Sequence, residues 1–188
     1  MLRNTLLLLL LIGVGSIREC PMPTIREPQM HFSSTVAADF RDLANDTWAQ
    51  FLSTFSARTD CFGDVTLNTN PDLESRAVYD PRSTTVTVRV PGTPAFLQAA
   101  LVHEWAHHVE FQCDAHQKLR PTILSLLNLP SDTAWRAEHQ WADSPSEHYA
   151  EAVVELVLGD HPLPTKIRVN QDIVSILSEW SKGSNHLE

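Results

Sequence analysis

The sequence predicts an α+β domain in which helices outweigh a small β-sheet. Apolar residues recur at spacings of three and four through much of the chain after residue 35, as in helices that bury one face. Residues 61–92 are instead rich in Val and Thr and alternate along TTVTVRV, which is typical of short strands. The chain of 188 residues suffices for one domain with its own core, which we expect over 35–188.

The first expected element is a helix over 35–57, for which Ser34 is the predicted N-cap. Two or three short strands follow within 61–92, with a hairpin turn at 80–83. Thr93 and Pro94 then open the next helix as N-cap and first helical residue, and this helix runs to about Phe111. Three further helices are expected over 132–141, 143–159 and 165–181.

The N-terminus is typical of an export signal. An apolar run from Thr5 to about Val14 follows a basic residue. The uncharged stretch around it, 4–17, is shorter than the ~20 residues of a membrane span. Gly13 and Gly15 are small residues at the positions that precede a cleavage site. We expect 1–15 to be a signal peptide or an uncleaved signal-anchor, and 16–34, with its three prolines, to be a linker or pro-like segment. The protein would be secreted or extracytoplasmic, or tethered to a membrane through this N-terminal segment.

Net charge limits the possible binding partners, and the cysteine content predicts a disulfide. A formal net charge of −9 argues against binding to nucleic acid or to an acidic membrane surface, which both require a surplus of Lys and Arg. Of Cys20, Cys61 and Cys113, two are expected to pair in an exported protein. Three pairings are open, and we favour Cys61 with Cys113, because these two flank the region of the expected active centre.

The stretch LVHEWAHHVEF (101–111) contains the motif His-Glu-x-x-His. On a helix, positions i and i+4 lie one above the other, so His103 and His107 can converge on one zinc ion per chain. Glu104 then faces the water that such an ion holds and can act as a general base. The alternative is a core helix with hydrogen-bonded histidines, which would bury the Glu104 carboxylate without a counter-ion, at a high cost in free energy.

A catalytic zinc ion needs a third protein ligand and one open position. Glu147 and Glu151 are spaced i, i+4 in the largely apolar run SEHYAEAVVELVLG. Glu147 is the candidate ligand, and Glu151 is expected to accept a hydrogen bond from the outer nitrogen of a ligand histidine. His108 points about 100° away around the helix, so it is expected behind the site or at the surface, and Glu110 is a neighbour rather than a ligand. His116 stays open as an alternative third ligand.

Together, His-Glu-x-x-His and a Glu-x-x-Ala-Glu-Ala motif about forty residues later resemble the gluzincin type of zincin metallopeptidase. The stretch EHYAEA is most similar to the anthrax lethal-factor-like peptidase domain, in which the first Glu of this motif, here Glu147, is the third zinc ligand. The resemblance implies a zincin-like fold with a short sheet beside the helix of 101–111. It also implies an edge strand that pairs with an extended peptide substrate, for which 84–90 is the natural choice.

The sequence departs from that family at one point. The family carries a tyrosine shortly before the third ligand, which helps to stabilise the oxyanion, whereas AEHQWADSPSE contains none. His139 is the expected substitute donor, and Tyr149 and His148 are weaker candidates.

These observations predict a zinc metalloendopeptidase that acts on a peptide or protein substrate. Zinc would be held by His103, His107 and Glu147, and Glu104 would take a proton from water and return it to the leaving amine. The alternative is a catalytically silent binding or adhesion module on a zincin fold, with structural zinc or none. Glu104 favours catalysis, because a purely structural site needs no general base.

Overall fold

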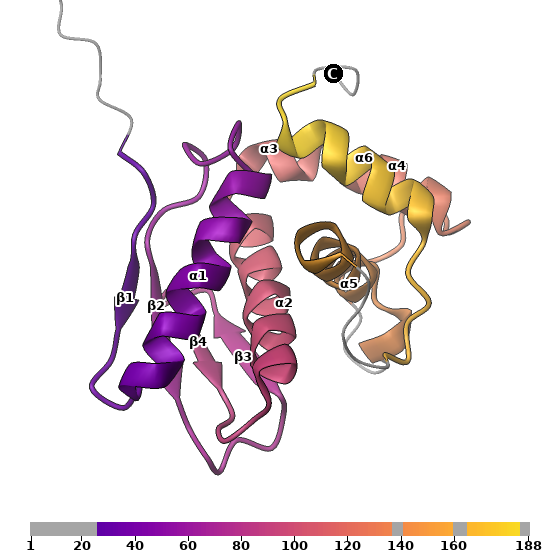
Figure 1. Cartoon of the computed structure of the whole chain (residues 1–188). Coiled ribbons are helices and arrows are strands. Elements are labelled where there is room, and N and C mark those ends of the chain that lie inside the picture. The colour runs from indigo at the N-terminus through magenta and orange to yellow at the C-terminus, as the bar shows by residue number, and fades with distance from the viewer. Residues whose placement is uncertain (1–25, 137–140, 160–164, 185–188) are drawn as a thin grey trace, which may run out of the picture.

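The computed structural model describes residues 26–136, 141–159 and 165–184 (Figure 1). It is an α+β fold in which about half of the described residues are helical, with one four-stranded mixed sheet. The expected signal peptide at 1–15 and Cys20 lie outside the described residues. None of the helices that the structure describes has the length and apolar character needed to cross a membrane.

The sheet combines parallel strands with one antiparallel edge strand. The strands are β1 (Met30–Phe32), β2 (Val65–Thr69), β3 (Ala77–Asp80) and β4 (Thr85–Val88). Their order is β1-β2-β4-β3, with β2 parallel to both β1 and β4. β3 and β4 form the antiparallel hairpin that was predicted from the turn at 80–83.

Two predictions for this region were wrong. Residues 30–32, expected within the linker of 16–34, form strand β1, with Met30 opposite Val65. A three-residue strand is too short to show alternation and forms only because β2 offers it a partner. The stretch 84–90, expected to supply the edge strand, instead forms the internal strand β4, so β3 is the edge beside β4.

Helix α2 lies at the centre of the fold. The helical segments are α1 (Ala38–Thr54), α2 (Pro94–Gln112), α3 (Asp114–Gln117), α4 (Arg120–Leu126), a 3₁₀ turn η1 (Trp141–Asp143), α5 (Pro145–Leu158) and α6 (Gln171–Ser181). α1 and α2 lie along one face of the sheet, and α5 and α6 pack beyond α2 (Figure 1). Because α2 contacts the sheet on one side and α1 and α5 on the others, it is buried nearly all round.

Local end signals placed α2 and α5 correctly. α2 begins at Pro94, and the Thr93 hydroxyl accepts a hydrogen bond from the Phe96 N–H at 3.3 Å. α5 begins at Pro145 and ends before Gly159, which has a φ of 79°.

Other predicted boundaries were wrong. α1 is capped by Ala37 rather than Ser34, and α6 begins only at Gln171, where the Asn170 side chain caps it. A helix was predicted over 132–141, but residues 132–136 are not helical; residues 137–140 lie outside the described residues. The Trp135 carbonyl accepts hydrogen bonds from the Ser146 N–H and the Ser144 hydroxyl, so this carbonyl bonds to the start of α5 rather than within a helix of its own.

An aromatic cluster in the core fixes α2 against α1. Trp105, from within the His-Glu-x-x-His motif, is fully buried and lies with its ring centroid 4.8 Å from that of Trp48 on α1. Phe51 contacts both tryptophans, at 5.5 Å from Trp48 and 5.6 Å from Trp105. Such edge-to-face and stacked contacts add to the hydrophobic effect, so the helix that carries the motif is held rigidly from behind.

The predicted disulfide between Cys61 and Cys113 is confirmed. It joins the residue that follows α2 to the segment before β2, across a sequence separation of 52 residues. Reduction is therefore expected to lower the free energy of unfolding by up to about 4 kcal/mol, because the unfolded chain regains the entropy of that loop. Urea unfolding of the oxidised and reduced protein measures the difference. The C61S/C113S double variant, insensitive to reductant, is the control; equal unfolding midpoints for the oxidised and reduced protein would contradict the expectation.

Candidate metal centre

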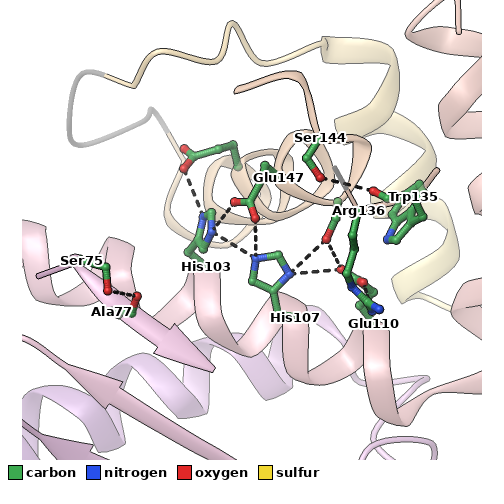
Figure 2. Close-up of polar contacts among 11 residues, drawn as sticks. Ser75, Ala77, His103, His107, Glu110, Trp135, Arg136, Ser144 and Glu147 are labelled. Atoms are coloured by element: carbon green, nitrogen blue, oxygen red, sulfur yellow. Dashed lines mark hydrogen bonds and ion pairs between the residues drawn. The ribbon is translucent and has the colours of Figure 1, made fainter. Parts of the chain in front are cut away.

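Helices α2 and α5 bring three potential metal ligands together (Figure 2). His103 and His107 lie one turn apart on α2, and their Nε2 atoms are 3.2 Å from each other. Glu147, in the first turn of α5, places Oε2 at 3.0 Å from His103 Nε2 and Oε1 at 3.5 Å from His107 Nε2. One ligand atom from each residue lies within 4.8 Å of the others.

The spacing of these atoms fits a metal ion. Two nitrogens bound at about 2.0–2.1 Å to a tetrahedral ion lie about 3.3 Å apart, close to the separation between His103 and His107. Two imidazoles and a carboxylate are also a common donor set for a divalent transition metal. The group of His103, His107 and Glu147 could therefore hold an ion.

The charges around the group favour a cation. Burial opposes protonation of His107, but hydrogen bonds to Glu110 and Glu147 outweigh it and raise the pKa of its imidazole to about 10. Burial likewise opposes ionisation of Glu147, yet its contacts with the two histidines lower its pKa to about 2. Glu104 and Glu151 add two further buried acidic side chains. The acidic groups of the site therefore stabilise positive charge nearby. Protons on the histidines provide this charge, and a bound divalent ion could provide it instead.

A cleft of about 430 Å³ opens in front of the group. Its lining includes three consecutive residues of β3, Ala77, Val78 and Tyr79, together with the three potential ligands and Glu104. Glu104 is only 7% exposed, and burial raises the pKa of its carboxyl. The charges of His103 and His107 act in the opposite direction and lower this pKa. The side chain of Glu104, the candidate general base, therefore lies at the cleft between α2 and the sheet edge.

A carboxylate lies behind each of the two histidines. Glu151 Oε1 is 3.1 Å from His103 Nδ1, and Glu110 Oε2 is 3.1 Å from His107 Nδ1. Burial opposes ionisation of Glu110, but hydrogen bonds from His107 and Ser146 and the charge of Arg136 lower its pKa to about 2. Glu110 was expected only as a neighbour of the site, although its i, i+3 spacing from His107 signals the contact. Nothing in the sequence pattern signals Ser146 or Arg136.

His108 was expected behind the site or at the surface, and it lies in the core with 0% exposure. Its Nε2 is 2.9 Å from the Gly63 carbonyl oxygen, which can only accept, so Nε2 carries the proton. Nδ1 therefore accepts a hydrogen bond from the Tyr79 hydroxyl, at 2.9 Å. His108 thus fastens α2 to the edge strand β3.

The expected oxyanion donors are not brought to the cleft in the part of the chain that the structure describes. His139 lies outside the described residues. Tyr149 is fully buried, with its ring centroid 4.4 Å from that of His116. His148 Nε2 lies 3.0 Å from the carbonyl oxygen of Ala142, to which it donates, and is not among the residues that line the cleft.

Comparisons of the chain with protein-family models, with curated proteins and with solved structures find no match. Any assignment of function therefore rests on the chemistry of the site itself.

His116, the alternative third ligand, lies apart from the ligand group. It is fully buried against Tyr149, Trp135 and Trp180. Burial lowers the pKa of His116 to about 3, the charges of Arg120 and Arg136 act in the same direction, and Glu110 opposes them. The imidazole is therefore neutral in the folded protein at moderately acid pH.

This neutral histidine is expected to make the fold sensitive to acid. Below pH 6.5 the unfolded chain binds a proton at His116 that the folded protein does not, until the pH falls to about 3. Stability is thus lost as the pH falls through this window, by about 2.5 kcal/mol at pH 4.5 from this group alone. The variant H116F is expected to lose correspondingly less stability than the parent between pH 7.5 and 4.5. Urea unfolding at both pH values measures it, and equal losses would contradict the prediction.

Proposed function

We propose that the protein is an exported zinc-dependent metallopeptidase of the zincin type. The observation that carries the proposal is the convergence of both motif histidines with Glu147, forty residues along the chain. A buried carboxylate directly after the first of these histidines, facing a cleft, supports catalysis over a purely structural ion. The disulfide supports export, because such bonds persist mainly in oxidising compartments.

In this proposal His103, His107 and Glu147 hold the ion. Zinc supplies Lewis acidity there, polarising the scissile carbonyl and lowering the pKa of water. Glu104 accepts the proton of the attacking water on its carboxylate and passes it to the leaving amine, which breaks the peptide bond. Its burial supports this role, since a raised pKa makes the carboxylate a stronger base. His139 stays the proposed donor to the oxyanion.

A peptide substrate would lie along β3, the strand at the cleft, and pair with its backbone. Val78, Phe111 and Trp141 are 45%, 40% and 46% exposed and are the large hydrophobic side chains that are exposed among the described residues. All three line this cleft. Clustered exposed apolar side chains are typical of binding surfaces, so they support a substrate with apolar side chains near the scissile bond.

Removal of the metal tests the proposal. The purified protein is expected to contain one zinc ion per chain and to cleave members of a mixed-sequence peptide library, with products identified by mass spectrometry. A zinc chelator should abolish cleavage, and added zinc should restore it. Saturation with zinc at about 100 times its dissociation constant should also raise the free energy of unfolding by about 2.7 kcal/mol.

The alternative, a silent binding or adhesion module, predicts that zinc binds but no peptide is cleaved. Cleavage that survives the chelator would contradict the role of the metal.

A further inference from the structure

Glu110 links the two helices that carry the metal ligands, and we propose that it is a positioning residue of the metal centre. Its side chain is 0% exposed. Its Oε2 accepts one hydrogen bond from His107 Nδ1 on α2, at 3.1 Å, and another from the Ser146 hydroxyl on α5, at 2.5 Å (Figure 2). The inference rests on the metal site of the proposed function but not on peptidase activity.

The first of these bonds fixes the state of the His107 ring. A neutral imidazole carries one N–H, and a carboxylate at Nδ1 keeps the proton there. When a metal ion displaces the second proton, the lone pair is therefore at Nε2, the atom that faces His103 and Glu147. A carboxylate behind a ligand histidine also orients the ring and raises its basicity toward a metal.

The second bond fixes the position of the carboxylate ligand. Ser146 directly precedes Glu147 in the first turn of α5. Its bond to Glu110 therefore attaches this turn to α2 one turn beyond His107. A closed ring of contacts thus spans the two helices, through His107 and Glu110 on α2 and Ser146 and Glu147 on α5. The Glu110 carboxylate thus determines both the orientation of the His107 ring and the position of Glu147 relative to it.

Arg136 allows this carboxylate to remain ionised in the interior. It forms an ion pair with Oε1 of Glu110, the oxygen that His107 and Ser146 leave free. Its guanidinium also lies 3.6 Å from the ring centroid of Phe111, which holds it in place beside the cleft. A buried charge that is both paired and hydrogen-bonded is far less costly than an isolated one.

Glu151 makes the reciprocal contact from the other helix. It belongs to α5 and faces His103 Nδ1 on α2. The helices are thus joined by a carboxylate of α2 that contacts α5 and by a carboxylate of α5 that contacts α2. Each acts behind one of the two histidines, so the ligand atoms are oriented by the same contacts that dock the helices.

The test compares zinc affinity in Glu110→Gln, Ser146→Ala and the double variant. Each protein is titrated with zinc in competition with a chromophoric chelator, and Co²⁺ is bound separately so that its visible absorption reports ligand geometry. Glu110→Gln is expected to weaken zinc binding about 10- to 100-fold and to alter the Co²⁺ spectrum. Ser146→Ala should weaken it about fivefold. The double variant should fall short of the product of both effects, because both act through one carboxylate.

Glu179→Gln, the same substitution at an exposed position of α6, is the matched control and should bind zinc as the parent does. Urea unfolding of the metal-free proteins shows that each variant folds. If Glu110→Gln does not fold, the smaller change Ser146→Ala and its Co²⁺ spectrum carry the test. Zinc affinities within twofold of the parent in every folded variant, with unchanged Co²⁺ spectra, would overturn the inference. A parent that binds zinc yet cleaves no peptide overturns the peptidase proposal alone; a parent that binds no zinc overturns both.

Discussion

Replacement of Glu104 by Gln is expected to lower peptide hydrolysis by about 10²- to 10⁴-fold while zinc stays bound. The amide has nearly the shape of the carboxylate but cannot accept the proton of water, and a general base contributes a rate factor of this size. Zinc should remain, because the proposed ligands are His103, His107 and Glu147. Loss of a buried carboxylate should also leave the metal-free fold at least as stable as before, since burial opposes the Glu104 charge.

The measurement pairs steady-state hydrolysis of one identified library peptide with zinc content by elemental analysis. Glu179→Gln, at an exposed position of α6, controls for the change of charge. A loss of both zinc and activity in Glu104→Gln would assign the residue to metal binding. Hydrolysis at the rate of the parent would exclude it as the base.

Replacement of Glu147 by Ala is expected to remove zinc from the protein. This change deletes one of three ligands and leaves His103 and His107 without the carboxylate that faces both Nε2 atoms. Loss of a carboxylate that merely orients a ligand costs about 10- to 100-fold in affinity, so loss of a ligand should cost more than about 100-fold. Activity should fall in parallel, because the proposed hydrolysis depends on the ion.

Zinc affinity is measured by competition with a chelator, beside Glu155→Ala as a control. Glu155 lies on the same helix two turns further on, where its carboxylate bonds to Gln171. The control should bind zinc as the parent does. Unchanged zinc affinity in Glu147→Ala would mean that another residue supplies the third ligand.

The parts of the fold and site that the sequence predicts are those encoded locally. Thr93 and Pro94 determine where α2 begins, and Gly159 determines where α5 ends, through backbone preferences that act within a few residues. The i, i+4 spacing of His103 and His107 likewise depends only on helix geometry. Glu147 was predicted from its i, i+4 spacing with Glu151 in a largely apolar run and from the resemblance of this run to the gluzincin motif.

Features that depend on distant parts of the chain could not be predicted in this way. The alternation of TTVTVRV identifies a strand but not its place in the sheet, so β4 was assigned to the edge that β3 occupies. Arg136 lies in a turn segment that contacts Glu110 and the start of α5 through tertiary contacts. The ion pair of Arg136 with Glu110 depends on how the chain folds, and no spacing in the sequence indicates it.

The hydrogen bond between Tyr79 and His108 fixes the register of β3, the strand along which a peptide is proposed to bind. His107 and His108 are adjacent on α2, yet one faces the ligand group and the other holds the edge strand. A slip of β3 by one residue would move its backbone donors by about 3.3 Å and turn its side chains to the other face. The hydrogen bond from the Tyr79 hydroxyl to His108 opposes this slip, so the register of β3 is fixed next to His107, one of the proposed metal ligands. If a peptide pairs with β3 as proposed, its peptide bonds would lie in a constant register relative to the proposed ion, whatever its sequence.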